Sequence, residues 1–557
     1  MESPAATARA DDDPRARRLA ALAVAALCVL TLVVRLVVNV PRTGLNHGDV
    51  SFYYTVAKNL AQGRGFVIDY IWNFWDDPQG FPTPSNVWWM PLPSLICAAG
   101  MKLFGVGYVV AQTTMIVATS VLPLVVYLLG RQLVGGRVVP LLGAALATTF
   151  HLFLDQPCVP LSHGPYVVLA SLSLFLGLRA ARTGRGWLWA GAAIGATQMA
   201  RSDGIVLFAS LGLAWLVVAP RPRPTWWRVL LAAAGGYALV MSPWWAHNLS
   251  LYGALQPGGS FRAIFLRDYE SWYSLPGSVT PQSWLADGWG KVWDLKSHVA
   301  AVNLETLGTG LVTGAFDRKG APDVPALVAV LCLAWAGVVA ALCRAATRRA
   351  LVPLAGQALL EFSFYTLVFT AVGPESFRSG MYSLYPAFLI YAALALVEGA
   401  RLLVLLSRVL RRSEPYHPAF PLVVAAAVAV WIMVGQFAFA KASMETKGQS
   451  IDELNEFYRA WSAKTLPLLG PDPVLMARDV HELHALTGLR CVMIPYEDEP
   501  TIRATAKRYG VTHILLIGDP DRPLRPALKD IDRMPWYELV TQGKALGQIV
   551  RVYRIVG

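Results

Sequence analysis

The sequence predicts an all-α polytopic membrane bundle of about eleven transmembrane helices, followed by a C-terminal extracytoplasmic α/β domain. Three observations support this prediction. The 557 residues are 55% hydrophobic and 15% charged, with a mean hydropathy of +0.45, whereas about a quarter of the residues of a soluble domain are charged. Long apolar runs recur through the first part of the chain. After about residue 441 the composition becomes that of a small soluble domain.

The apolar runs define the expected spans. They fall at 19–40, 109–130, 138–154, 164–180, 187–201, 204–220, 229–246, 323–343, 351–372, 381–400 and 419–440. Alternate linkers carry clusters of arginine, and the short linkers between them carry at most one positive charge. Because cytoplasmic linkers collect Lys and Arg, the N-terminus is expected in the cytoplasm and the C-terminal segment outside.

Two long outer loops and a soluble tail complete the expected organisation. We expect a transmembrane domain over 1–440, with outer loops at 41–108 and 247–322, and a soluble extracytoplasmic α/β domain over 441–557. Both loops are rich in Trp, Tyr, Pro and Gly, which is typical of ordered functional loops. The first loop ends in an apolar helix, which is expected to lie in the outer interface with Trp88 and Trp89 at headgroup depth.

Composition and motifs exclude several functions. The net charge of +12 is spread over short clusters between apolar runs, so it indicates membrane topology and not nucleic-acid binding. The six cysteines lack metal or redox spacing. The sequence contains no Gly-rich phosphate loop, nucleophile elbow or HExxH, which argues against a nucleotide-driven pump.

Asp49 is the most informative single residue. A helix is expected from Val50, because apolar residues recur every four positions from Phe52 to Leu60. An Asp just ahead of such a helix could simply cap its free amides. Its position at the outer end of a span, where a water-filled cavity could meet a lipid-borne substrate, equally indicates chemistry.

Other polar residues collect at the outer ends of the spans. They are His47, Asp155, His163, Arg201, Asp203, His247, Asn248, Arg262, Arg267, Glu375 and Arg378. For any one of them, a side chain that reaches towards the lipid headgroups is the simpler explanation. Several of them on one face, opposite a carboxylate, indicate a phosphate site, because the planar fork of arginine binds phosphate oxygens in pairs.

Several motifs carry a resemblance to a known family. They are GDVSFYYTVAKNLAQGRGF, MPLPSLICAAGMKLFG, GATQMARSDGIVLF, SPWWAHNLSLYGAL, FRSGMYSLYPAFLI, VLMARDVHELHALTGLRCVMIP and AKRYGVTHILLI. In this order, over nearly the whole chain, they resemble the GT-C class of polytopic glycosyltransferases. The resemblance is to bacterial members similar to the lipid A aminoarabinose transferase and the protein mannosyltransferases.

The resemblance implies an inverting transfer of a sugar from a polyprenyl-phosphate donor to an envelope glycan, lipid or protein on the outer face of the cytoplasmic membrane. Asp49 matches the family's Asp that activates the acceptor, and a carboxylate there can take the proton of an attacking hydroxyl. Fixed positive charge would stabilise the departing phosphate. The candidates for that role are Arg201, His247, Arg262 and Arg378. Residues expected to contact substrate are His47, Tyr53, Lys58, Asp203 and Tyr382.

The sequence departs from the family pattern where a metal would bind. Val50 follows Asp49 where relatives often carry a second acid, and His163 stands where many carry a Glu. No cofactor is therefore certain; a divalent metal would have Asp155 and His163 as weak candidate ligands. Two other functions remain open: a secondary transporter or lipid flippase, and a catalytically inactive envelope-assembly scaffold of the same fold. A transporter predicts broken helices at mid-membrane and inverted halves.

Overall fold

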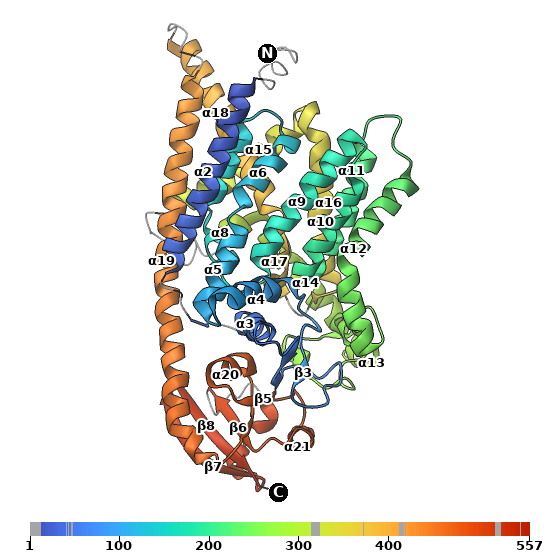
Figure 1. Ribbon diagram of the computed structural model, residues 1–557, viewed down its shortest axis with the longest axis vertical. Helices are drawn as coiled ribbons and strands as arrows, with labels where there is room; N and C mark the ends of the chain where they lie inside the picture. Colours follow the sequence, from blue (N-terminus) through green and yellow to red (C-terminus); the bar gives the residue numbers. More distant parts are fainter. Residues whose placement is uncertain are drawn as a thin grey trace.

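The computed structural model describes residues 13–40, 42, 44–45, 48–312, 323–370, 373–411, 417, 419–518, 525–545 and 547–556. His47, one of the predicted substrate contacts, lies outside these residues. The molecule consists of a helical bundle, a layer of short helices and strands across one end of it, and a mixed α/β unit beyond that layer (Figure 1).

Every predicted apolar run coincides with helix. The bundle helices are α2 (Pro14–Asn39), α5 (Tyr108–Thr119), α6 (Leu122–Leu133), α7 (Val138–Thr149), α8 (His151–Leu154), α9 (His163–Thr183), α10 (Trp187–Ala200), α11 (Leu207–Val217), α12 (Trp226–Tyr252), α15 (Val324–Leu342), α16 (Ala345–Leu367), α18 (Tyr385–Arg411) and α19 (Phe420–Thr465). Among the described residues, eight helical segments are long and apolar enough to cross a membrane, with α5 and α6 forming one of them. The number is nine if α7 and the bent segment after it form a single span.

Glycines allow some bundle helices to touch backbone to backbone. A Cβ at Gly191 of α10 would lie 1.8 Å from the carbonyl oxygen of Ala233 in α12, and one at Gly236 would lie 1.9 Å from that of Leu188. Helices in lipid associate through such close contacts between small residues, because burial of apolar surface gives them little driving force there. The short helix α10 is therefore held tightly against the longer α12.

The layer across the end of the bundle is built from the two long loops. From the first loop come α3 (Gly48–Ala61), α4 (Leu92–Phe104) and strands β1 (Val67–Ile68), β2 (Tyr70–Ile71) and β3 (Thr83–Pro84). From the second come η3 (Gly258–Phe265), η4 (Glu270–Tyr273), α13 (Pro281–Leu285), α14 (Gly288–Thr309) and η5 (Gly310–Val312). Helices η1 (Gln156–Cys158), η2 (Ser202–Val206), α17 (Gly373–Gly380) and η8 (Met381–Ser383) join bundle helices. Helices α3 and α4 lie across the bundle axis (Figure 1), as expected for an interfacial segment.

The C-terminal unit contains most of a six-stranded sheet in the order β2-β5-β4-β6-β8-β7. Its own elements are η9 (Leu466–Leu468), β4 (Val474–Ala477), α20 (Val480–Thr487), β5 (Arg490–Met493), α21 (Glu499–Arg508), β6 (His513–Ile517), η10 (Pro526–Leu528), η11 (Ile531–Arg533), β7 (Tyr537–Ala545) and β8 (Gln548–Ile555). Strands β5, β4 and β6 run parallel, whereas β8 and β7 are antiparallel. Along the chain, helices α20 and α21 alternate with strands β4, β5 and β6, and β8 follows β7 directly.

Two features join this unit to the rest of the molecule. Helix α19 runs unbroken for 46 residues, about 69 Å at 1.5 Å per residue, which is more than twice the hydrocarbon thickness of about 30 Å. The boundary that we predicted between 440 and 441 thus falls inside a continuous helix. Strand β2 comes from the first long loop and pairs in parallel with β5, so the two regions share one sheet.

An aromatic cluster fills the space between the first loop and the C-terminal unit. The ring of Trp89 lies 4.3 Å from Phe52 and 4.4 Å from Trp72, and Trp72 lies 5.6 Å from His481 of α20. Trp88 packs 5.0 Å from Trp272 of the second loop. Trp88 and Trp89, predicted at headgroup depth, therefore serve as core residues between domains.

Candidate active site

Asp49 lies in the first turn of α3, which begins at Gly48 and not at Val50 as the sequence predicted. It is therefore part of the helix, and its carboxylate lies at the end of the helix dipole that favours negative charge. Asp49 is half-buried. The local sequence explains its position, because Val50, Phe52 and Val56 are fully buried and fix the orientation of the helix.

Tyr53, one turn after Asp49, connects this carboxylate with the bundle. Its side chain is buried, and its backbone carbonyl accepts a hydrogen bond from Ser94 of α4 at 3.1 Å. Burial and the charge of Asp49 raise the pKa of Tyr53, whereas the charge of Arg201 and a hydrogen bond with Ser162 act in the opposite direction. Asp49 and Arg201 thus both lie close enough to this phenol to influence its ionisation.

Arg201 and Asp203 form a buried pair where α10 gives way to η2. The Nε of Arg201 donates to Asp203 Oδ2 at 2.8 Å, and its Nη2 donates to the Tyr365 hydroxyl at 2.8 Å. The Tyr365 hydroxyl in turn donates to Asp203 at 2.5 Å. The Arg201 side chain is 18% exposed and that of Asp203 only 1%. Asp203, a predicted substrate contact, is therefore buried and orients Arg201, whose side chain stays partly exposed.

A second buried acid, Glu361 of α16, extends this network. Its Oε1 accepts from the Tyr166 hydroxyl at 3.2 Å and from Gln357 at 2.9 Å, and the residue is fully buried. A Cβ at Gly380 of α17 would lie 2.9 Å from its Oε2, so a glycine is needed there. Sequence reasoning missed Glu361, although an acid inside the run 351–372 was a signal, because ionisable groups within spans are usually functional.

Asp155, a candidate metal ligand, is held by two cations. Arg42 donates to its Oδ1 at 2.5 Å, and Lys447 of α19 contacts its other oxygen. The Arg42 side chain is fully buried and that of Asp155 is 19% exposed. Asp155 therefore neutralises a buried arginine and ties the end of α2 to α19. Neither Arg42 nor Lys447 was singled out from the sequence, because nothing local shows that they converge.

His163, Tyr382 and Arg378 lie close together. The Nε2 of His163 lies 2.9 Å from the Ser379 hydroxyl, and its ring lies 4.9 Å from that of Tyr382. Tyr382 is buried and donates to the Leu152 carbonyl at 3.2 Å. Arg378 is close enough to act electrostatically on Tyr382. The structure thus brings a predicted donor-phosphate residue next to a predicted substrate contact.

The remaining predicted residues lie apart from this group. His247 stacks on Trp244 at 4.8 Å and packs against Phe66 at 5.2 Å. Arg262 donates to the Pro276 carbonyl at 2.6 Å, inside the second loop. Lys58 is exposed on α3. The described contacts of these three residues do not bring them to Asp49.

The metal candidates do not assemble into a site. Asp155 is engaged by cations and His163 by Ser379, and no His, Cys, Asp or Glu group of three or more in the described residues could hold a metal ion. Cations at Asp155 already neutralise the charge that a divalent ion would need. The donor set therefore does not fit a metal, and no chemistry is assigned to one.

Helix α20 of the C-terminal unit meets the start of α3. A Cβ at Gly48 would lie 3.1 Å from the ring of His481 and 3.8 Å from Glu482 Oε1. The Nδ1 of His481 lies 3.1 Å from the Tyr70 hydroxyl. Burial, the charge of Asp479 and then that of Asp49 raise the pKa of Glu482 to about 8. Sequence reasoning assigned the tail no chemistry, yet it places a carboxyl group beside Asp49.

Known proteins support this arrangement. Residues 84–247 match the family described as dolichyl-phosphate-mannose-protein mannosyltransferase. The archaeal oligosaccharyltransferase AglB from Archaeoglobus fulgidus, solved with an inhibitory peptide and a dolichol-phosphate, superposes with a TM-score of 0.55 and 13% identity, covering 89% of this chain and 69% of AglB. ArnT from Cupriavidus metallidurans, bound to undecaprenyl phosphate, gives a TM-score of 0.53 and 16% identity, covering 96% of this chain and 97% of ArnT. No curated protein matches the sequence.

The chain is therefore a polytopic membrane protein with the fold of the GT-C glycosyltransferases. Within it, residues 84–247 carry the sequence pattern of the dolichyl-phosphate-mannose-protein mannosyltransferases. The resemblance that the motifs indicated is confirmed at the level of the fold.

Proposed function

We propose that the protein is a membrane glycosyltransferase that moves a sugar from a polyprenyl-phosphate donor to an envelope acceptor, with inversion, on the outer face of the cytoplasmic membrane. The observation that supports the proposal is the position of Asp49 in the first turn of α3, one turn before a buried Tyr53 whose ionisation both Asp49 and Arg201 influence. This displacement requires a base for the acceptor hydroxyl and a cation for the departing phosphate.

The proposed chemistry is a single displacement. An acceptor hydroxyl attacks the anomeric carbon, its proton passes to the Asp49 carboxylate, and the bond from that carbon to the donor phosphate breaks. The phosphate oxygen leaves with the bonding electrons, and the guanidinium of Arg201, which is partly exposed, stabilises its charge. One displacement at the anomeric carbon inverts its configuration.

The proposed topology places this site outside the cytoplasm. Helix α2 begins at the end of the bundle opposite the C-terminal sheet (Figure 1), so an odd number of spans separates them. Nine spans, or eleven with α10 and α11 included, satisfy this condition, and eight do not. Helices α10 and α11 are consecutive. The side of the membrane on which each remaining loop lies is therefore the same whether both helices are counted as spans or neither is. The arginine-rich linkers then face the cytoplasm, in agreement with the positive-inside rule.

The proposed domain organisation follows from the same arrangement. The transmembrane domain, 1–440, carries Asp49 in its first outer loop, and the C-terminal domain, 441–557, packs over α3 on the outer side. Arg378 and His163 are proposed to contact the donor, and the buried Tyr382 next to them is proposed to support this contact. His247 and Arg262 stay proposed donor-phosphate residues, and their described contacts do not include Asp49.

The test is mass spectrometry of lipid-linked sugars and envelope glycans in cells with and without the protein. The proposal expects a polyprenyl-phosphate sugar to accumulate without the protein and to be consumed on complementation. Complementation with Asp49→Asn should leave the intermediate in place. An unchanged lipid-linked pool with altered solute uptake would instead identify a transporter and refute the proposal.

A further inference from the structure

The parallel strands of the C-terminal sheet create a topological switch point. The chain passes from β4 through α20 to β5 on one side, and from β5 through α21 to β6 on the other side of β4. The direction of winding thus reverses between β4 and β6. In open α/β sheets, ligands bind at the carboxyl ends of the strands at such a point.

A cavity of about 50 Å³ lies at this position. It is lined by the ends of β4 and β6, among them Ala477, Arg478 and Leu515, and by Ile494 just after β5. Because one water needs about 10–15 Å³ on this measure, the space holds a few waters or one small anionic group. A nucleotide is too large for it.

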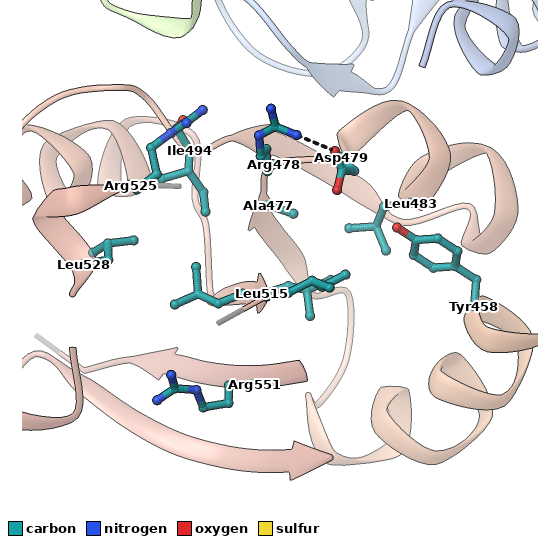
Figure 2. A pocket seen from close by; sticks show the side chains of 13 residues that line it. Tyr458, Ala477, Arg478, Asp479, Leu483, Ile494, Leu515, Arg525, Leu528 and Arg551 are labelled. Atoms are coloured by element: carbon teal, nitrogen blue, oxygen red, sulfur yellow. Dashed lines mark hydrogen bonds and ion pairs between the residues drawn. The ribbon is translucent and has the colours of Figure 1, made fainter. Parts of the chain in front are cut away.

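Arginines surround the cavity. Figure 2 shows Arg478 and Arg525 along one side, and Arg551 beyond Leu515 on the other. Arg525 is 2% exposed, and the Nε of Arg478 is buried without a hydrogen-bond partner. A buried guanidinium is stable only when an anion compensates its charge, so this rim requires one.

In the structure two anions face the rim: Asp479, 3.5 Å from Arg478, and Glu270 from the second long loop, which contacts both Arg478 and Arg525. Arg478 donates to its Oε1 at 2.9 Å, and Arg525 donates to its Oε2. Each carboxylate oxygen therefore has a guanidinium of its own, which is the arrangement of a built carboxylate or phosphate site. Glu270 stands in for such a ligand.

Hydrogen bonds also join the loop that carries Glu270 to the carboxyl edge of the C-terminal sheet. The Ser274 hydroxyl donates to the Tyr496 carbonyl at 3.0 Å, and the Leu275 amide donates to Glu497 at 2.8 Å. The Tyr496 amide donates to the Tyr273 carbonyl at 3.2 Å. Residues 270–275 thus form a strap across the carboxyl ends of the strands, with Glu270 at its start.

We propose that the carboxyl edge of the C-terminal sheet is a binding site for a soluble carboxylate or phosphate, and that Glu270 occupies it as an internal ligand. A soluble anion exchanges with Glu270 on Arg478 and Arg525. This exchange detaches the strap from the C-terminal domain. No bond is made or broken, and the proposal does not depend on the transferase activity.

The simpler explanation is a domain-joining salt bridge. The chain offers a matched example in Arg508, which contacts Asp77 of the first loop at 2.6 Å, with side chains 48% and 67% exposed. That pair has one guanidinium, lies in solvent and does not line the cavity. The Glu270 site differs in all three respects.

The test uses the full-length protein in phosphatidylcholine nanodiscs, titrated with inorganic phosphate, and separately with acetate, at constant ionic strength. Removing an internal competitor raises the fraction of open site, so Glu270→Gln should bind phosphate at least about tenfold tighter than the wild type. The double variant Glu270→Gln/Arg478→Gln should show no saturable binding. The control variant Arg508→Gln should bind as the wild type does.

Hydrogen exchange of the strap supplies a second readout. Saturating phosphate should increase exchange at residues 270–275 in the wild type and have no further effect in Glu270→Gln. Thermal unfolding verifies that all variants are folded. If Glu270→Gln loses stability as Arg508→Gln does and binds neither phosphate nor acetate, the salt bridge is only structural and the proposal is overturned. Transferase activity affects none of these readouts.

Discussion

Asp49 and Asp155 both follow a bundle helix at the same end of the molecule, yet their surroundings differ. Asp155 lies between the buried guanidinium of Arg42 and the ammonium of Lys447. Asp49 is half-buried in the first turn of α3, and it lies close enough to Glu482 to raise the pKa of that carboxyl group. A carboxylate that is held by two cations binds a proton weakly and is a poor base. Position at the outer end of a span does not by itself separate a structural acid from a catalytic one.

The largest expected effect is on catalysis at Asp49. Asp49→Asn keeps the shape of the side chain but removes the base, so sugar transfer in reconstituted membranes should fall by about 10²–10⁴-fold. The melting temperature should change little. The measurement is turnover of the lipid-linked sugar that accumulates in cells without the protein. Wild-type turnover in the variant would remove the assigned mechanism.

Substitution of Asp155 should lower stability and leave turnover unchanged, the opposite of substitution of Asp49. Asp155→Asn leaves the fully buried Arg42 without a countercharge, and removing one partner of a buried pair costs about 3–5 kcal/mol. We expect a large loss of thermal stability in nanodiscs and a normal turnover per folded molecule. Lys447→Gln, at the 37% exposed end of the network, should cost less. A stable but inactive Asp155→Asn would show that both acids are catalytic.

Substitution of Arg201 tests whether this residue stabilises the departing phosphate. Losing a bidentate guanidinium contact costs about 1.5–3 kcal/mol, so Arg201→Lys should lower kcat/KM for the lipid-linked donor by about 10–100-fold. The control is Tyr365→Phe, which removes the hydroxyl shared by Arg201 and Asp203 but keeps the charge. A stability loss without a kinetic one would limit Arg201 to a structural role.

The smallest expected effect concerns pH and Glu482. Its pKa is raised from 4.5 to about 8, so the folded state binds this proton more tightly than the unfolded state. The stabilisation is fully present below the unfolded pKa and is lost as pH rises through about 8. As the pH increases from about 4.5 to about 8, the melting temperature of Glu482→Gln should therefore rise relative to that of the wild type. A difference that does not change with pH would show that Glu482 ionises normally.

The sequence predicted those features that depend on neighbouring residues. Apolar runs located the bundle helices, and the change of composition after about residue 441 indicated the α/β unit. Strand β2 was missed because two residues, Tyr70 and Ile71, give no periodic signal and their partner strand lies far along the chain. The same reason hid Arg42 and Lys447, since each looks like an ordinary charge at a helix end until Asp155 is placed between them.

The predicted site depends on the fold in a related way. Asp49, Tyr53 and Arg201 were chosen because each stands beside a span end, the structure brings Asp49 and Arg201 into electrostatic range of Tyr53, and their roles stay predictions. Asp203 was assigned to substrate because sequence cannot distinguish an exposed acid from one sealed under Tyr365. Glu482 was overlooked because the tail was treated as a separate domain.

The strand shared between the first loop and the tail has a consequence for synthesis. Tyr70 contacts His481, which is 411 residues further along the chain. At about 5–20 residues per second, the ribosome needs about 20–80 s to reach the partner of this strand. During that interval the tryptophan-rich first loop has already been synthesised without the sheet that completes it. Truncation of the last hundred residues should therefore yield a misfolded loop, prone to proteolysis, and not merely a shorter protein.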